Sequence, residues 1–207
     1  MLRSNKMRDR FAESRYEVWS HARKMWENGL VTGSSGNVSA RTADDPSVIA
    51  ITPTSITYEE MAAQQIVVVD LLTGSPIESK DAPSYELPMH RVIYRDMPNV
   101  SAIVHTHSPF VTTLSVLRRP LPPLIDEMLQ RFGGTVEVAD YAPSGTEDLG
   151  RHAVKALGSR SAAILANHGN VCIGGSIGEA LQTAIAMEAA ARVYLQALQA
   201  GDPYVLR

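Results

Sequence analysis

Two histidines, His105 and His107, stand one residue apart at the end of an apolar run, and a third, His168, stands far downstream before a glycine. In an extended strand, residues i and i+2 point to the same face, roughly 6–7 Å apart, so one divalent cation could lie between the two imidazoles. A carboxylate would complete a four-ligand site, and Glu86 is the strongest candidate. Imidazole and carboxylate donors in this number are typical of zinc sites.

The spacing of His105 and His107 leaves other interpretations open. A buried imidazole must find a hydrogen-bond partner for each ring nitrogen. Two such rings on one face of a strand could bind a metal, bind each other through water, or pair with acidic side chains. Glu86 and His90 are four residues apart and would share a helix face, where they could equally form a surface pair.

The composition is that of an ordinary globular protein. The chain has 207 residues, of which 44% are hydrophobic, and this length favours a single domain spanning residues 1–207. A net charge of −3 argues against nucleic acid or a membrane surface as a partner. The single cysteine, Cys172, excludes an internal disulfide and fits a reducing compartment. With neither a secretory signal nor a membrane-spanning run, we expect a cytoplasmic protein.

Hydrophobic periodicity and turn residues predict a mixture of helices and strands. Helices are expected at residues 8–29, 83–94, 109–117, 123–132 and 176–195, with another beginning at 146. Strands are expected at residues 38–41, 48–52, 66–70, 102–107, 136–138 and 163–166. The clearest helix is the last, where Ser176 and Glu179 form a capping-box pattern and Gly201 ends the helix. The mixture, without repeats or linkers, indicates an α/β layered domain.

Three places rich in hydroxyl groups follow a predicted strand or open a predicted helix: residues 34–37, residues 52–55 and Ser84. The first, Ser-Ser-Gly-Asn, lacks the glycine spacing and the lysine of a P-loop and also occurs as a plain turn. Hydroxyl and backbone N–H groups can nevertheless surround an oxyanion without a positive charge. If the three places converge, they could bind one phosphate group.

Five motifs occur in an order that resembles the class II aldolase/adducin family. They are Gly36-Asn37-Val38-Ser39, Thr52-Pro53-Thr54, Pro83-Ser84-Tyr85-Glu86, His105-Thr106-His107-Ser108 and Asn167-His168-Gly169. The segment 139–146 also resembles this family, and the likeness covers residues 19–195. The resemblance implies a three-layer α-β-α sandwich with a central, mostly antiparallel or mixed sheet. It also implies a homotetramer with four-fold symmetry, whose active sites lie at subunit interfaces.

The resemblance assigns residues to two parts of an active site. It implies that His105, His107 and His168 bind zinc with Glu86 as the fourth group, and manganese or cobalt could replace the zinc. It places a second set of residues around the phosphate of a phosphorylated sugar substrate: Ser35, Gly36, Asn37, Thr54, Ser55 and Ser84.

The resemblance further implies a lyase of carbohydrate metabolism, an aldolase that cleaves a ketose 1-phosphate through a metal-stabilised enediolate. A substrate similar to L-fuculose 1-phosphate or 5-deoxyribulose 1-phosphate would give dihydroxyacetone phosphate and an aldehyde. Glu86 would carry the proton to and from the carbanion carbon, and Glu127 or Asp126 would handle the proton of the aldehyde oxygen.

Three positions depart from the pattern of the members that cleave fuculose phosphate. Tyr85 stands where those members have a second serine. Asp126 falls near the position of a catalytic tyrosine from a neighbouring subunit, and Tyr204 is the candidate substitute for a second tyrosine in the C-terminal tail. The pair Glu127-Met128 instead resembles a dehydratase of the same family.

Other reactions that share the intermediate stay open. A decarboxylase, dehydratase or epimerase acting on a sugar or sugar-acid phosphate would use the same metal ligands, although Glu86 argues against an epimerase branch that has aspartate there. A decarboxylase needs a cation for the substrate carboxylate, and Arg118 and Arg119 are candidates that could equally be surface residues. A non-catalytic, adducin-like scaffold is a remote alternative, because it predicts loss of the metal ligands and all four are present.

Overall fold

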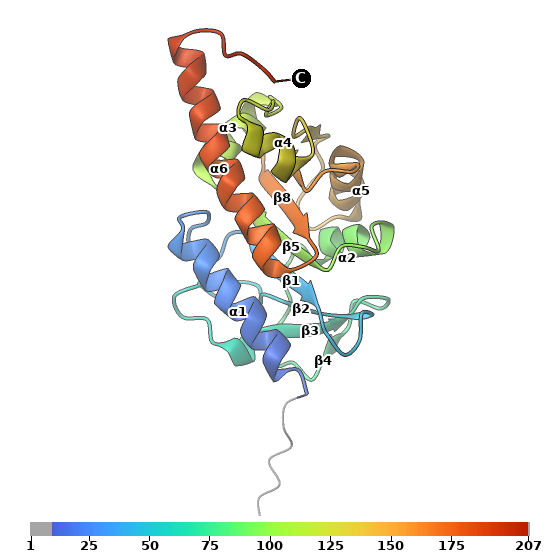
Figure 1. The fold of residues 1–207 in the computed structure, drawn as a ribbon. Coiled ribbons are helices and arrows are strands. Elements are labelled where there is room, and N and C mark those ends of the chain that lie inside the picture. The colour runs from blue at the N-terminus through green and yellow to red at the C-terminus, as the bar shows by residue number, and fades with distance from the viewer. Residues whose placement is uncertain (1–9, 207) are drawn as a thin grey trace, which may run out of the picture.

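The computed structural model, which describes residues 10–206, is built on one eight-stranded sheet (Figure 1). The strands lie in the order β4-β3-β2-β1-β5-β8-β7-β6. Neighbouring strands are antiparallel except for β6 and β7, which are parallel. The strands are β1 (Asn37–Arg41), β2 (Val48–Ile51), β3 (Val67–Asp70), β4 (Pro76–Ile77), β5 (Ala102–Thr106), β6 (Val138–Ala139), β7 (Ala162–Leu165) and β8 (Gly169–Gly174).

Helices cover both faces of this sheet (Figure 1). One core lies between the sheet and α1, α3, α4 and α6, and a second core lies between the sheet and α2 and α5. The helices are α1 (Ala12–Glu27), α2 (Leu87–Asp96), α3 (Pro109–Leu117), α4 (Asp126–Phe132), α5 (Glu147–Leu157) and α6 (Ile177–Ala200), with a short 3-10 helix η1 (Ala63–Gln65). The fold is therefore a three-layer α-β-α sandwich with a mixed, mostly antiparallel sheet, which confirms the predicted fold class.

The alternation of side chains along β5 decides which layer each residue faces. Ala102 and Val104 belong to the core under α6, whereas Ile103 belongs to the core under α2 and α5. His105 continues the row of Ile103 and is fully buried on the α2 side of the sheet. A shift of one residue in the pairing would turn His105 into the opposite core.

Two element ends differ from the prediction and bear on the site. Strand β5 ends at Thr106, so His107 lies just beyond the strand instead of inside it. The helix predicted from residue 83 begins at Leu87, with Glu86 as its N-cap residue. Both changes place a polar side chain at the end of an element, where the backbone turns away and leaves room for ligands.

Three further differences come from residues that pair at long range. The helix predicted from residue 123 begins only at Asp126, because the chain before it is extended and Leu121 forms an isolated bridge with Val136. Strands β4 and β8 were not predicted. Strand β8 lies between β5 and β7 with both faces covered, so its residues lack the polar and apolar alternation that marks a half-exposed strand.

Helix α6 begins as its sequence predicts. Ser176 Oγ accepts a hydrogen bond from the Glu179 backbone N–H at 3.2 Å, and the Glu179 carboxylate accepts from the Gly175 N–H at 2.9 Å. Gly201 follows the last turn as predicted. Neither α6 nor any other helix in the described part of the chain is long and apolar enough to cross a bilayer.

We expect the Gly150→Ala variant to be less stable than the original protein, because Gly150 lies where α5 packs against α2. A Cβ atom at this position would lie 2.6 Å from Val92 Cβ and 3.1 Å from the Met89 carbonyl oxygen. Alanine improves helix propensity by about 1 kcal/mol, but overpacking costs about 1–3 kcal/mol. Urea denaturation should therefore give a lower free energy of unfolding for this variant.

The matched control is Gly178→Ala in the first turn of α6. The nearest atom to a Cβ at this position is 3.8 Å away, so the protein should be as stable as before or more stable. Equal stability of the two variants would contradict the close packing of α5 on α2.

Candidate active site

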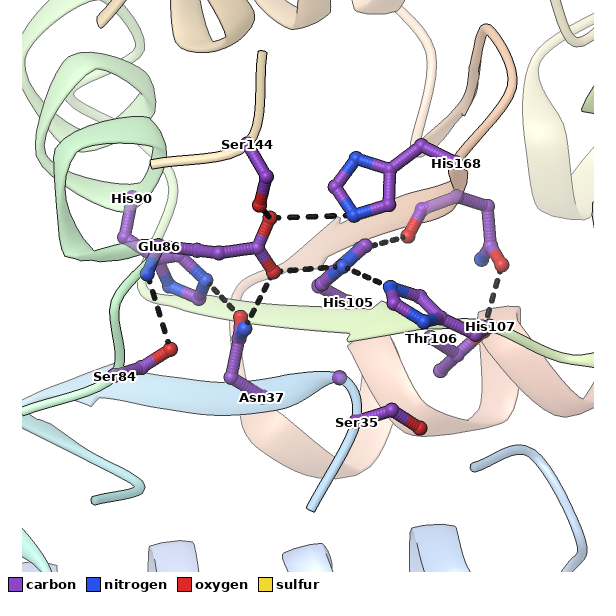
Figure 2. Close-up of polar contacts among 12 residues, drawn as sticks. Ser35, Asn37, Ser84, Glu86, His90, His105, Thr106, His107, Ser144 and His168 are labelled. Carbon is purple, nitrogen blue, oxygen red and sulfur yellow. Dashed lines mark hydrogen bonds and ion pairs between the residues drawn. The ribbon is translucent and has the colours of Figure 1, made fainter. Parts of the chain in front are cut away.

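Three imidazoles and one carboxylate from distant parts of the chain meet near the end of β5 (Figure 2). Glu86 Oε2 lies 2.9 Å from His105 Nε2, and Glu86 Oε1 lies 3.3 Å from His168 Nε2. His107 Nε2 lies 2.9 Å from His105 Nε2. One ligand atom from each of the four residues falls within 4.8 Å of the others. The structure thus brings all four predicted metal-ligating residues together.

Each of these side chains comes from the end of an element or from a tight turn. His105 and His107 flank the last residue of β5, and Glu86 caps α2. His168 belongs to the turn 166–168 between β7 and β8, in which Asn167 has a φ of 55°. Asparagine enters this left-handed region more readily than most residues do. The turn points the His168 ring toward Glu86 (Figure 2).

Hydrogen bonding determines which nitrogen of His105 faces the cluster as an acceptor. A carbonyl oxygen can only accept, so His105 Nδ1–H donates to the Asn170 carbonyl at 2.8 Å, which leaves Nε2 as the ring nitrogen that faces the cluster and would bind a metal once it loses its proton. Metal-ligating histidines typically have their second nitrogen engaged in this way. Donors around a tetrahedral cation lie roughly 3.3 Å apart when the bonds are about 2.0–2.1 Å; three of the donor pairs here are 2.9–3.3 Å apart, and all four donors lie within 4.8 Å of one another. The donor set therefore fits a divalent metal.

Burial and mutual charge set the protonation of the cluster. Burial, together with nearby His105, lowers the pKa of His107 to about 3 and the pKa of His168 to about 4. Both rings are neutral at pH 7, the form that binds metals. Burial alone would raise the pKa of Glu86, but attraction to His105 and His168 outweighs it and holds this pKa well below its usual range. Burial likewise disfavours charge on His105, yet the Glu86 carboxylate outweighs it and raises the pKa of His105.

The Glu86 carboxylate is 6% exposed and accepts a hydrogen bond on each oxygen. Ser144 Oγ donates to Oε1 at 2.7 Å, and Asn37 Nδ2 donates to Oε2 at 2.8 Å. Ser144 lies in the segment 139–146, which carried the family resemblance, but it was not predicted to be part of the site. Only its hydroxyl within that motif could have indicated it, because no local spacing connects it to Glu86.

A hollow beside this cluster contains all six residues that were assigned to the phosphate. It is lined mainly by small, hydroxyl-bearing and polar residues: Ser34, Ser35, Gly36, Asn37, Pro53, Thr54, Ser55, Ser84, Tyr85, Glu86, His107, Ser144 and His168. No lysine or arginine of the described chain is among these residues. An anion in the hollow would therefore meet hydroxyl and backbone N–H donors.

The backbone of the hollow is shaped by two residues with positive φ. Gly36 has a φ of 72°, and a Cβ there would lie 2.6 Å from the His105 carbonyl oxygen. Ser55 has a φ of 60°, which is uncommon for a residue with a side chain. Such conformations are frequent where a binding loop is held by its surroundings.

Asn37 and His90 occupy places that were not predicted from the sequence. Both polar atoms of the Asn37 side chain are engaged inside the protein, because Nδ2 donates to Glu86 and Oδ1 accepts from His90 Nε2 at 2.5 Å. His90 is fully buried, so it does not form a surface pair with Glu86. Its Nδ1 lies 2.6 Å from Ser39 Oγ. The Asn37 side chain is thus turned toward Glu86 and His90 and not toward the hollow.

The remaining predicted residues lie in different positions relative to the hollow. Tyr85 lines it, is 69% exposed and covers Gly145, where a Cβ would lie 2.3 Å from the Tyr85 ring. Asp126 and Glu127 are in the first turn of α4, and Glu127 lines a groove between α4 and α6. Tyr204 is 96% exposed in the segment after α6. Within one chain, Asp126, Glu127 and Tyr204 are not among the residues that line the hollow.

Comparison with known proteins decides the family. Residues 16–195 match the family model described as the Class II Aldolase and Adducin N-terminal domain. The chain belongs to the class II aldolase and adducin family. This confirms the resemblance inferred from the five motifs.

Individual members of the family are similar over nearly the whole chain. The 5-deoxy-D-ribulose 1-phosphate aldolase of Bacillus thuringiensis serovar kurstaki is 33% identical, over 94% of this chain and 90% of that protein. A solved structure of an L-fuculose 1-phosphate aldolase is 34% identical with a TM-score of 0.89, covering 94% of this chain and 91% of that one. The structure of YgbL from Klebsiella pneumoniae is 32% identical with a TM-score of 0.84, covering 94% of both chains. YgbL itself is described as an aldolase, epimerase or decarboxylase.

The metal-free protein is expected to lose stability as the pH falls from about 6.5 to about 4. Burial lowers the pKa of His90 and His107 to about 3 and that of His168 to about 4, whereas unfolded histidines titrate near about 6.5. The unfolded chain then binds up to three more protons on these histidines, and below pH 4.5 one more on Glu86, whose folded pKa is lowered. Each additional proton lowers the free energy of unfolding by about 1.4 kcal/mol per pH unit. The raised pKa of His105 makes the free energy of unfolding depend on pH only above about pH 6.5.

Urea denaturation of chelator-treated protein between about pH 7 and pH 5 measures this slope. In a His107→Ala variant the free energy of unfolding should change less steeply with pH, by about 1.4 kcal/mol per pH unit, because one of the three titrating rings has been removed. A free energy of unfolding that does not change over this range would show that the buried rings are not held neutral.

Proposed function

We propose that the protein is a divalent-metal-dependent aldolase that cleaves a ketose 1-phosphate into dihydroxyacetone phosphate and an aldehyde. The observation that carries this proposal is the position of Glu86 with His105, His107 and His168 beside a hollow lined by hydroxyl groups. A phosphorylated sugar needs both features, one for its carbonyl end and one for its phosphate. Similarity to aldolases of 5-deoxyribulose and fuculose phosphates supports a substrate of this size.

We assign His105, His107 and His168 as the ligands of the metal, with Glu86 as the fourth ligand before substrate binds. Zinc suits this set, and manganese or cobalt could replace it. When bound, the cation would act as a Lewis acid toward the carbonyl and adjacent hydroxyl oxygens of the substrate. The Asn170 carbonyl holds His105 in the required tautomer through the hydrogen bond at Nδ1.

Glu86 carries the proton in this proposal. Its carboxylate lies at the start of α2 and stays ionised, because its pKa is held well below the usual range by His105 and His168, which outweigh the effect of burial. In cleavage Glu86 would take up a proton from solvent and give it to the carbon that loses its bonding partner when the carbon–carbon bond breaks, and in the reverse condensation it would remove a proton from that carbon. Ser144 and Asn37 keep the two oxygens oriented while this happens.

The substrate phosphate is assigned to the hydroxyl-lined hollow. The proposed contacts are the six predicted residues: Ser35, Gly36, Thr54, Ser55 and Ser84, with Asn37 contributing through its backbone alone, because its side chain is held by Glu86 and His90. Backbone N–H groups and hydroxyls can bind a phosphate without a positive side chain. Tyr85 stands at the same wall, so it is the residue we expect to adjust which sugar phosphate fits.

The working form is proposed to be a cytoplasmic homotetramer with active sites between subunits. Exposed apolar residues on and around α3, α4 and α6 support association, among them Val116, Leu117, Ile125 and Val193. Asp126 or Glu127 on α4, or Tyr204 after α6, would then reach the site of a neighbouring subunit and handle the proton of the aldehyde oxygen.

A decarboxylase of a phosphorylated sugar acid is the second candidate, since it would use the same metal ligands. One observation favours it. The Arg118 guanidinium donates to Asn167 Oδ1 at 3.2 Å, and Asn167 directly precedes His168. A cation bonded to the residue before a proposed metal ligand could bind a substrate carboxylate, and neighbouring Arg119 is exposed as well.

Incubation of the metal-loaded protein with a panel of ketose 1-phosphates tests the reaction. Fuculose, rhamnulose and 5-deoxyribulose 1-phosphates should be compared, with dihydroxyacetone phosphate release coupled to a reporter enzyme. Release from at least one of them is expected, and prior treatment with a chelator should abolish it. If no sugar phosphate releases dihydroxyacetone phosphate and a phosphorylated oxo acid releases carbon dioxide, the aldolase proposal is refuted and the decarboxylase proposal is supported.

The Glu86→Gln variant tests the proton carrier. Glutamine has nearly the same shape as glutamate but cannot accept a proton near neutral pH, so kcat should fall by about 10²–10⁴-fold. Metal content, measured by mass spectrometry on the same samples, distinguishes loss of proton transfer from loss of metal. A variant that retains its metal and turns over at nearly the original rate would exclude Glu86 as the acid and base.

A further inference from the structure

A buried row of polar side chains leads away from Glu86 between α2 and β1. Glu86, His90 and Tyr94 are spaced four residues apart along α2, and Asn37 and Ser39 are two residues apart on β1. Four helical residues rise roughly 6 Å and two strand residues roughly 6.6 Å. Because these distances nearly match, side chains from the two elements can alternate in a single row.

Each member of the row lies within hydrogen-bond distance of the next. Asn37 Nδ2 is 2.8 Å from Glu86 Oε2, and His90 Nε2 is 2.5 Å from Asn37 Oδ1 (Figure 2). Ser39 Oγ is 2.6 Å from His90 Nδ1 and 2.8 Å from the Tyr94 hydroxyl. Ser39 and His90 are fully buried, and Asn37 and Tyr94 are each 2% exposed. The hydrogen bonds of the row therefore have to be satisfied within the protein.

The direction of donation along the row is determined at the Glu86 end. An ionised carboxylate can only accept, so Asn37 must turn its amide N–H toward Glu86 and its carbonyl oxygen toward His90. His90 must then donate from Nε2, which leaves Nδ1 to accept from the Ser39 hydroxyl. Ser39 in turn accepts from Tyr94. Every hydrogen bond in the row points toward Glu86, and bonds aligned in this way strengthen one another in a low dielectric.

We propose that His90 is a positioning residue for the reaction, which holds the Asn37 amide in the one orientation that gives Glu86 a donor. The proposal rests on the proposed role of Glu86 as proton carrier and metal ligand. If the Asn37 amide turned over, its carbonyl oxygen would face the carboxylate at 2.8 Å, and the two would repel each other. The side chain of Glu86 would then leave the place from which it meets both metal and substrate.

Two substitutions of His90 distinguish a role in positioning Asn37 from a role in filling the core. In His90→Gln the amide nitrogen can take the place of Nε2 and donate to Asn37, whereas in His90→Asn the shorter side chain reaches only the place of Nδ1. Both variants replace a buried imidazole by a smaller amide, so both should lower the melting temperature. We expect kcat to fall about 10- to 100-fold in His90→Asn with KM little changed, and His90→Gln to recover most of the loss.

Metal binding provides a second readout that needs no turnover. In titrations with cobalt(II), followed by visible absorption, His90→Asn should bind about 10- to 100-fold more weakly and show an altered spectrum. His90→Gln should resemble the original protein. A protein that cleaves none of the sugar phosphates would refute the proposed function but would leave this comparison fully interpretable.

A double-mutant cycle with Asn37→Ala decides whether His90 acts through Asn37. If it does, His90→Asn should cause little further loss of kcat or cobalt affinity once Asn37 has been removed. Effects that add would overturn the proposal. The proposal would also be overturned if His90→Asn and His90→Gln lost kcat and cobalt affinity equally, in proportion to their fall in melting temperature. That result would show that the imidazole only fills space.

Discussion

A carboxylate that is almost fully removed from water must be stabilised by the groups around it, and the centre of this protein is organised around that requirement. Glu86 is met by Ser144 and His168 at one oxygen and by Asn37 and His105 at the other. These partners come from four segments of the chain that are far apart in sequence. The same arrangement that stabilises the charge of Glu86 therefore also ties the start of α2 and the segment 139–146 to the central strands of the sheet.

The sheet makes the convergence possible because its central strands carry the key residues side by side. Asn37 on β1 lies opposite His105 on β5, and His105 lies opposite Val171 on β8. The close approach leaves no space for a side chain at Gly36, which meets the His105 carbonyl. Rigid pairing of this kind places the ring nitrogens more accurately than loops alone could, and accurate placement is what a metal site demands.

Metal ligands alone do not specify a reaction in this family, because cleavage, decarboxylation and epimerisation can share one type of intermediate. The chemistry is then decided by groups that surround the substrate away from the metal. In this chain the candidates for such groups are the hydroxyls and backbone N–H donors in the hollow and Tyr85 at its wall, whereas Arg118 lies outside the hollow beside Asn167. In the proposed tetramer the acidic residues on α4 would take part from a neighbouring subunit, so assembly and specificity would be linked.

The amino-acid sequence by itself determined the layered α/β class, the histidine and glutamate set and the hydroxyl-rich turns, since periodicity and short motifs are local properties. Only the tertiary structure decided the buried role of His90, the contact of Ser144 with Glu86 and the central strand β8. Asn37 and Glu86 are 49 residues apart, and Ser144 and Glu86 are 58 apart. No local pattern encodes such contacts. They arise because strand pairing and helix packing bring those side chains into one enclosed space where each polar atom needs a partner.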